Sequence, residues 1–134
     1  MDCIFCKIII GELPSWKIYE DEHTLAFLDI FPVHKGHALV VPKKHCTDFV
    51  SADPECLRHV HEVAQKVAKA VIAGTNADGC NVTTNNGVAA GQEVFHLHWH
   101  IIPRFENDGL HLWPQSQYAD GEKETVQENI KKHL

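Results

Sequence analysis

Hydrophobic and polar positions along the chain predict several short strands around one long helix. Residues 3–11 can form one or two helical turns that end at a glycine. Residues 17–20 and 24–28 flank a short polar turn, a pattern that is typical of a hairpin. A further, buried strand is expected at 37–41, stopped by the proline that follows it.

The longest helix is expected to begin directly after residue 53. Asp53 is a favourable N-cap, and Pro54 suits the first helical position. Gly74 is expected to stop the helix. Between these limits apolar residues recur at spacings of three and four, which places on one helix face Leu57, Val60, Ala64, Val67 and Val71.

The second half of the chain alternates between strands and loops before a final helix. Residues 80–84 form an expected strand, and the loop 85–91 after it has small residues that let the backbone approach a ligand closely. Residues 107–121 show no clear periodicity. Residues 122–133 are expected to form a short helix, because acidic residues come early in it and lysines late.

These elements predict an α+β fold with a largely antiparallel sheet, one long helix and a short C-terminal helix. With 134 residues, 44% of them hydrophobic, the chain is long enough to bury one ordinary core. We therefore expect a single domain over residues 1–134, in which 107–134 form a C-terminal tail that includes the short helix.

The stretch FHLHWHIIPR, residues 95–104, places a histidine at every second position from 96 to 100. Successive side chains of a strand point to opposite faces, so His96, His98 and His100 are expected on one face and their apolar neighbours on the other. Histidines two residues apart lie about 6.6 Å apart along a strand, which is too far for one metal ion to bind all three easily. We therefore expect the three imidazoles to have different roles.

Charge and cysteine content narrow the classes of function. The formal net charge of −6 argues against a surface that coats nucleic acid, so no nucleic-acid partner is expected. No stretch approaches the length of a membrane span, and none resembles a secretory signal. Five cysteines, an odd number, indicate free or metal-bound thiols in a reducing compartment. The cytoplasm is the expected location, with the nucleus left open.

Three stretches together resemble the histidine triad family. They are CIFCKII (3–9), AFLDIFPVHKGHALVVPKKH (26–45) and TTNNGVAAGQEVFHLHWHIIPR (83–104). The last contains the family's H-x-H-x-H followed by two apolar residues. The resemblance implies a HIT-like fold over most of the chain and a nucleotide hydrolase that works through a covalent nucleotidyl-histidine.

The resemblance assigns the nucleophile to His98, which attacks the α-phosphate of a nucleotide. A neutral imidazole is nucleophilic near pH 7 without first losing a proton from the attacking nitrogen. The other ring nitrogen of His98 is expected to donate to the backbone carbonyl of His96. His100 is expected to donate to a phosphate oxygen, joined by Asn85 and Gln92.

The nucleotide is expected to lie beside the triad, which His37 supports from the neighbouring strand. By resemblance, Asp29 accepts hydrogen bonds from ribose hydroxyls. From the residues alone, a turn cap accounts better for Asp29 than a ligand contact does, and core packing accounts better for the apolar residues around it. The expected substrate is a purine nucleotide of the AMP type, and the apolar residues implied to contact it are Ile4, Phe5, Ile8, Phe27, Ile30 and Val94.

One branch of the family binds zinc through a cysteine pair and two histidines, which here are Cys3, Cys6, His45 and His96. Two thiolates and two imidazoles suit a closed tetrahedral site of the structural type. Two buried thiols on a short helix are the alternative interpretation of the cysteine pair. No organic cofactor is expected. No chemical role is expected for the remaining cysteines, Cys46, Cys56 and Cys80.

The expected activity is cleavage of adenosine-type phosphoramidates. In the phosphoramidase branch a serine commonly stands three residues before the first triad histidine, whereas this chain has Glu93. A carboxylate there repels a phosphate leaving group and attracts a cationic amine, which favours aminoacyl-type phosphoramidates. The resemblance also implies a homodimer formed through the long helix and an adjacent strand, with Trp113 reaching toward the partner's site.

Three alternatives stay open at this point. A dinucleoside polyphosphate hydrolase uses the same nucleophile and differs in its leaving-group contacts. The second alternative is a zinc-stabilised nucleotide-binding module whose triad catalyses no reaction. A zinc hydrolase uses His96 and His98 as metal ligands.

Overall fold

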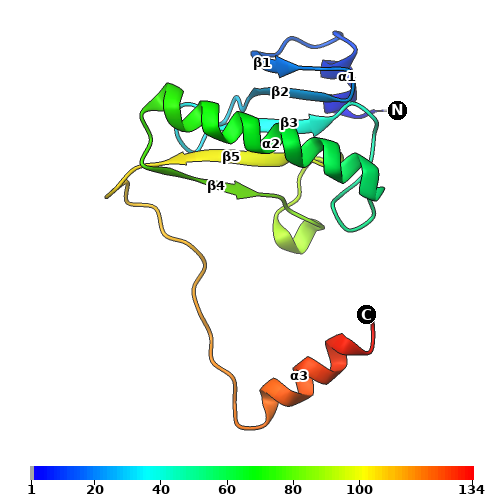
Figure 1. Cartoon of the computed structure of the whole chain (residues 1–134), viewed down its shortest axis with the longest axis vertical. Helices are drawn as coiled ribbons and strands as arrows, with labels where there is room; N and C mark the ends of the chain where they lie inside the picture. The colour runs from blue at the N-terminus through cyan, green and yellow to red at the C-terminus, as the bar shows by residue number, and fades with distance from the viewer. Residues whose placement is uncertain (1) are drawn as a thin grey trace.

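The computed structural model describes residues 2–134 and has a five-stranded sheet with three α-helices (Figure 1). The strands lie in the order β1-β2-β3-β5-β4, and every neighbouring pair is antiparallel. The predicted α+β class is therefore confirmed. The elements are α1 (Ile4–Ile9), β1 (Lys17–Glu20), β2 (Thr24–Leu28), β3 (Ala38–Pro42), α2 (Pro54–Thr75), β4 (Gly79–Thr83), the short 3₁₀ helix η1 (Val88–Ala90), β5 (Trp99–Arg104) and α3 (Glu122–Lys131).

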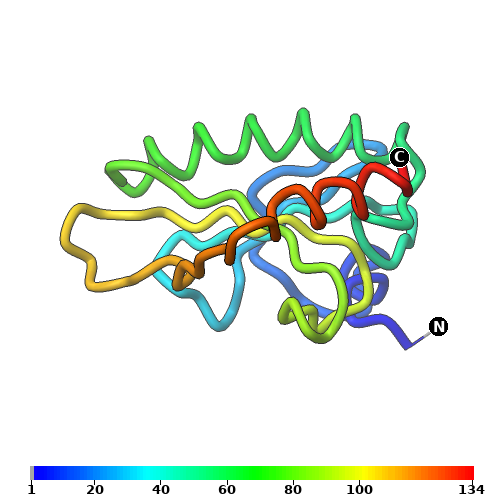
Figure 2. Tube along the Cα trace, turned by 90° about the horizontal axis from the view of Figure 1, so that it is seen from below, coloured from blue at the N-terminus to red at the C-terminus, as the bar shows by residue number. Residues whose placement is uncertain are grey.

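The long helix α2 covers one face of the sheet, and α1 and the loop that contains η1 lie on the other (Figure 2). Alternate residues of the central strand β3 divide between the two faces. Ala38 and Val40 pack in the cluster under α2, whereas Leu39 and Val41 pack in the cluster next to α1. The sheet thus has a buried side chain on both faces at its centre.

Helix α2 begins as predicted but ends two residues later than expected. The side chain of Asp53 accepts a hydrogen bond from the N–H of Glu55, and Pro54 occupies the first turn. Gly74 does not stop the helix. The backbone turns left-handed at Asn76 instead, with φ of 55°, and asparagine tolerates this conformation better than most residues.

The histidine segment enters the sheet later than its alternation predicts. Strand β5 begins only at Trp99, so His96 and His98 precede its regular ladder. The reason is a bond outside the sheet: the N–H of Leu97 donates to the carbonyl oxygen of Cys46 at 2.7 Å. The division of faces still holds, because Leu97 and Ile101 pack under α2.

The C-terminal tail stands apart from the sheet. An extended segment leads from β5 to α3, and Figure 1 shows α3 separated from the other elements. All residues from 109 to 134 are exposed, including the large side chains of Leu112, Trp113 and Ile130. None of the helices in residues 2–134 is long and apolar enough to cross a membrane.

Candidate active site and metal centre

A cavity of about 610 Å³ lies on the face of the sheet opposite α2. Its walls come from α1 and the segment after it, from β2 and the turn after it, and from the segments on either side of η1. It brings together most of the binding residues expected from the sequence. These are Ile4, Phe5, Ile8, Phe27, Asp29, Ile30, Asn85, Glu93 and Val94, with His37, His98 and His100.

Hydrogen bonds fix which ring nitrogen of His98 carries the proton. Its Nδ1 lies 2.7 Å from the carbonyl oxygen of His96, and because a carbonyl only accepts, Nδ1–H is the donor. The Nε2 of the neutral ring therefore keeps its lone pair. Thr84 Oγ1 donates to the carbonyl oxygen of His98 at 2.8 Å, and the Phe5 ring packs edge-on against the imidazole. His98 thus has the protonation pattern that a nucleophile requires.

The proton of His100 is placed by His37. The backbone N–H of Val33 donates to Nδ1 of His37 at 3.1 Å, so a neutral His37 carries its proton on Nε2. That Nε2 lies 3.0 Å from Nδ1 of His100 and donates to it. His100 therefore carries its own proton on Nε2. Its ring centre is 4.9 Å from that of His98, so a protonated and an unprotonated ring nitrogen belong to adjacent imidazoles.

Burial keeps these imidazoles neutral. Desolvation lowers the pKa of His98, against smaller opposing effects of the hydrogen bond to His96 and of Asp29, and it lowers the pKa of His37 against a smaller effect of Asp29. Desolvation and the charges of His98 and His37 lower the pKa of His100 to about 4. Because the pKa of an ordinary histidine is near 6.5, these rings carry no charge at pH 7.

The cavity itself is negatively charged. Asp29 and Glu93 line it, and none of the described lining residues is a lysine or an arginine. Asp29 Oδ1 accepts from the N–H of Phe31 at 2.8 Å, and Oδ2 lies 3.6 Å from Nε2 of His37. An anionic ligand must therefore be bound by neutral donors. This arrangement favours a single phosphate over a chain of phosphates, because every added charge meets two carboxylates.

The side chains of Asp29, His37 and His100 also bring three possible metal-ligand atoms within 4.8 Å of one another. Hydrogen bonding argues against a metal ion here. Since Nδ1 of His37 accepts the N–H of Val33, Nε2 is protonated and has no lone pair for a metal. His37 donates to His100 and so orients its ring, while the Asp29 carboxylate lies 3.6 Å from Nε2 of His37.

Gln92 is the expected phosphate-binding residue that lies outside the cavity lining. Its side chain is buried, and Oε1 accepts from the N–H of Gly87 at 2.8 Å. Its Nε2 donates to the carbonyl oxygens of Thr47 and Val94, so both amide hydrogens are used within the protein. Gln92 therefore holds the loop in place. Asn85 does line the cavity, where its amide makes one long bond, of 3.4 Å, to Gly91.

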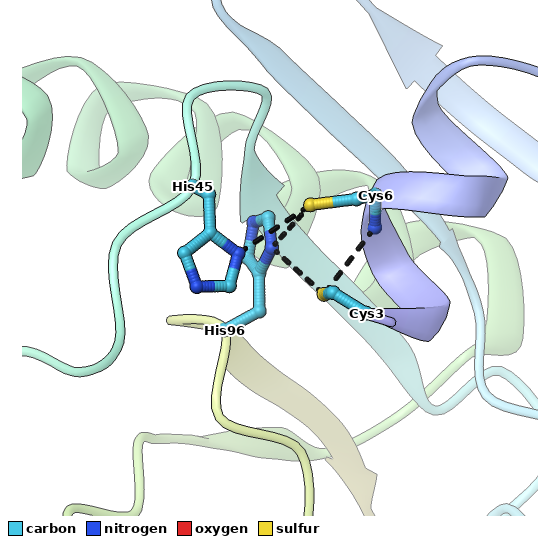
Figure 3. Close-up of side chains that lie close together, drawn as sticks. All are labelled: Cys3, Cys6, His45 and His96. Atoms are coloured by element: carbon cyan, nitrogen blue, oxygen red, sulfur yellow. Dashed lines mark hydrogen bonds between the residues drawn. The ribbon is translucent and has the colours of Figure 1, made fainter. Parts of the chain in front are cut away.

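Cys3, Cys6, His45 and His96 converge between α1, the loop after β3 and the segment before β5 (Figure 3). Cys3 Sγ lies 3.4 Å from Nδ1 of His96. Cys6 Sγ lies 3.4 Å from Nδ1 of His45 and 3.6 Å from Nδ1 of His96. His96 thus belongs to this cluster, whereas His98 and His100 belong to the cavity.

The four side chains fit a tetrahedral metal. His96 Nε2–H donates to the carbonyl oxygen of Pro42 at 2.8 Å, so its Nδ1 lone pair faces the sulfurs. Desolvation lowers the pKa of His96 to about 4, which keeps that lone pair free at pH 7. Bonds of about 2.3 Å to sulfur and 2.05 Å to nitrogen place ligand atoms roughly 3.6 Å apart in a tetrahedron, close to the separations observed.

Some residues that shape the site were not expected from the sequence. Leu13, Pro14 and Phe31 line the cavity, and their apolar character is the signal that the sequence offers for them. The amide of Val33 and the carbonyl of Cys46 act through the backbone, so their residue types carry no signal.

Comparison with known proteins identifies the family. The sequence pattern of the HIT domain matches residues 10–107, which include the cavity-lining histidines and most of the sheet. The chain belongs to the HIT family. Family membership supports nucleotide binding or hydrolysis as the general class of function.

Known HIT proteins resemble this chain over almost its whole length. A crystal structure of a HIT family member from Bacillus subtilis is 42% identical and superposes with a TM-score of 0.91, covering 100% of this chain and 98% of that one. A Zn-bound histidine triad family protein from Mycobacterium smegmatis is 36% identical, with a TM-score of 0.79 over 100% of this chain and 99% of that one. Adenylylsulfatase HINT3 of Arabidopsis thaliana is 39% identical over an alignment of 137 residues, gaps included. The alignment covers 99% of this chain and 70% of that protein.

Proposed function

We propose that this HIT domain hydrolyses purine nucleoside 5′-phosphoramidates, with His98 as the nucleophile. The observation that carries the proposal is the pair of tautomers beside the cavity: His98 keeps an unprotonated Nε2, and His100 keeps a protonated one. Nucleophilic attack on phosphorus needs the first, and stabilisation of a phosphate oxygen needs the second.

In the proposed first step, Nε2 of His98 attacks the α-phosphorus and the phosphorus–nitrogen bond breaks. The amine leaves with a proton taken from water, which becomes hydroxide, and a nucleotidyl-histidine remains. In the second step, this hydroxide attacks the phosphorus and the bond to His98 breaks, which releases the nucleoside monophosphate and restores the neutral imidazole. His100 donates its Nε2–H to a phosphate oxygen in both steps, as negative charge develops there.

The rest of the proposed site binds the nucleoside. The apolar cavity walls from Ile4, Phe5, Ile8, Phe27, Ile30 and Val94 enclose the base. Asp29 accepts hydrogen bonds from the ribose hydroxyls. Asn85 supplies a neutral donor near the phosphate, since its amide makes only one long bond within the protein. Gln92 supports the loop that carries Asn85.

Charge distinguishes the candidate leaving groups. Two unit charges 4 Å apart repel by about 1 kcal/mol in water and by about 4 kcal/mol at an effective dielectric constant of 20. Glu93 is exposed, so a polyphosphate leaving group meets the smaller, water-like repulsion there, whereas a cationic amine is attracted. The negative lining therefore favours phosphoramidates over dinucleoside polyphosphates. The similarity to an adenylylsulfatase makes a nucleoside phosphosulfate the second candidate substrate.

The test is turnover of an adenosine 5′-phosphoramidate by wild-type protein, by His98→Ala and by a control, His111→Ala, in the exposed tail. His98→Ala is expected to abolish turnover but to keep the affinity for the nucleotide within about tenfold, because it removes the covalent route and few ground-state contacts. Normal turnover by His98→Ala would refute the assignment.

Glu93→Gln tests the preference for the leaving group, since it removes the charge and keeps the shape. Relative kcat/KM is measured for an adenosine phosphoramidate of a cationic amine, a dinucleoside polyphosphate and adenosine 5′-phosphosulfate. The variant is expected to shift the ratio toward the two anionic leaving groups. An unchanged ratio means that Glu93 does not select the leaving group.

The four-residue cluster near α1 is proposed to hold a structural zinc ion. The donor set of two thiolates and two imidazoles supports zinc, as does the similarity to a Zn-bound relative. All four positions of a tetrahedral ion are filled by protein ligands, so the ion fixes α1 against the histidine segment. The reacting atoms lie in the neighbouring cavity, which favours this reading over a zinc hydrolase.

A homodimer is the proposed assembly. The exposed apolar side chains of the tail, such as Trp113 and Ile130, have no contact with the sheet of their own chain, which favours packing against a second copy. The structural similarity to the B. subtilis protein extends over the whole chain and therefore includes this tail. The five free thiols support a reducing compartment, and we propose the cytoplasm.

A further inference from the structure

Two cysteines outside both sites lie in contact with each other. Cys46 Sγ and Cys56 Sγ are 3.6 Å apart and come from positions ten residues apart in the chain. Cys46 lies in the loop after β3, and Cys56 lies in the first turn of α2. Neither side chain lines the nucleotide cavity or belongs to the metal cluster. The proposed function therefore leaves this pair unused.

Both cysteines are half-buried, and one of them lines a cavity. A second cavity, of about 450 Å³, lies between the turn before β2, the end of β3 and the start of α2. Cys56 lines it beside Lys44 and Arg58, and Cys46 does not. This cavity shares no lining residue with the nucleotide cavity. A small solute in this cavity therefore meets Cys56, and Cys46 is within reach of the Cys56 sulfur.

The second cysteine, Cys46, is half-buried and is connected to the histidine segment through its backbone. Its carbonyl oxygen accepts the N–H of Leu97 at 2.7 Å. Leu97 stands between His96, in the metal cluster, and His98, in the cavity. His45 of the metal cluster directly precedes Cys46. A displacement of Cys46 is thus transmitted to the metal cluster through the chain, and to His98 through one hydrogen bond to the neighbouring Leu97.

We propose that Cys56 and Cys46 form an oxidative modification site that reacts with hydroperoxides. The Cys56 sulfur, having lost its proton to water, attacks the terminal peroxide oxygen, the oxygen–oxygen bond breaks, and a sulfenic acid forms at Cys56. When the oxidant is hydrogen peroxide, its second oxygen leaves as hydroxide, which takes up the proton released by Cys56 and becomes water. The Cys46 thiol then attacks the Cys56 sulfur and expels the sulfenic hydroxyl, which leaves as a second water with the thiol proton. Both sulfurs are oxidised to one disulfide, and the peroxide is reduced.

The disulfide changes the position of Cys46. A sulfur–sulfur bond is about 2.05 Å long, so the observed gap of 3.6 Å must close by roughly 1.5 Å. Movement of Cys46 toward α2 displaces the carbonyl oxygen that accepts the hydrogen bond from Leu97, and with Leu97 it displaces the neighbouring His98. Displacement of a reacting group by 1 Å can lower a rate by about 10²-fold, so turnover is expected to fall at least tenfold on oxidation. This effect on turnover rests on the proposed function, whereas formation of the bond does not.

The experiment treats the zinc-loaded, full-length protein with hydrogen peroxide. Intact mass, the number of free thiols after denaturation and a peptide map locate the bond. Wild-type protein and a matched control, Cys80→Ser, are expected to lose two hydrogens and to give a cross-linked peptide that joins Cys46 and Cys56. Cys56→Ser and Cys56→Ala are expected to form no such cross-link, and the agreement of the two variants guards against a folding defect in either.

A bond between other cysteines, such as Cys3 and Cys6, overturns the proposal, as does the absence of any bond. Turnover before oxidation, after it and after reduction by dithiothreitol tests the coupling to His98. Recovery on reduction supports that coupling, and full turnover in the disulfide form refutes it. If the reduced protein shows no phosphoramidate turnover, the proposed function fails, but mass and peptide mapping still decide whether the site exists.

Discussion

The hydrogen bond from His37 to His100 gives the sharpest test of the proposed chemistry. His37→Met keeps a side chain of similar length and removes both ring nitrogens. It leaves Nδ1 of His100, a partly buried acceptor, without its donor at 3.0 Å. The free-energy cost of such an unpaired group is about 1–3 kcal/mol, which corresponds to a loss in kcat/KM of about 5- to 150-fold.

The physical reason lies in the tautomer of His100. Without a donor at Nδ1, His100 can place its proton there and present a bare Nε2 to the phosphate. His37→Gln is the matched variant, because its amide N–H can donate where the ring N–H did. It is expected to retain more of the wild-type kcat/KM than His37→Met does.

The assay combines steady-state kinetics with ¹⁵N NMR of the histidine rings, which reports directly which nitrogen of His100 is protonated. Urea unfolding of each variant separates a loss of stability from a loss of catalysis. The reasoning is refuted if His37→Met retains wild-type kcat/KM, or if the His100 proton resides on Nδ1 in the wild-type protein.

Four further predictions concern activity and stability against pH, the metal, and the core. Burial lowers the pKa of His98 and lowers that of His100 to about 4. The fall of kcat/KM on the acid side is therefore expected below pH 6.5. A fall centred at pH 6.5 contradicts the burial argument. Since the unfolded chain binds these protons more readily, the free energy of unfolding is expected to decrease as pH falls from 6.5 through about 4, which urea titrations at several pH values measure. Removal of metal by a chelator is expected to lower Tm and to speed hydrogen exchange of α1, and lost turnover with an unchanged Tm favours a metal hydrolase instead. Leu25→Ala, at a position with 0% exposure, is expected to cost about 2–5 kcal/mol in urea unfolding, whereas Leu134→Ala at the exposed end should change nothing measurable.

Much of the fold follows from the sequence because its pattern and its packing agree. The apolar recurrence from Leu57 to Val71 predicts the buried face of α2, and Val60, Val67 and Val71 are indeed in the core. The alternation around Leu97 predicts correctly which residues face α2. The prediction that α2 ends at Gly74 was wrong, because glycine is only one of the residues that accept a left-handed conformation. Asn76 adopts that conformation here.

The site was less predictable wherever backbone groups determine it. The cavity contains the expected histidines, Asp29 and Glu93, whose residue types signal chemistry. The amide of Val33, which sets the tautomer of His37, has no such signal, because any residue except proline supplies it. Gln92 has the right residue type for a ligand contact, but three hydrogen bonds within the protein use its side chain.

The apolar walls of the cavity and its histidines come from separate parts of the chain. Most of the apolar walls belong to residues 4–31, whereas His98, His100 and Asn85 belong to residues 85–100. Exchange of residues 4–31 between homologous proteins would therefore replace the apolar walls, and with them Cys6 of the metal cluster and the Phe5 ring that packs against His98, while His98, His100 and Asn85 stay the same. The shape of the cavity and the chemistry of its histidines are thus encoded in different stretches of the chain, which meet at Phe5.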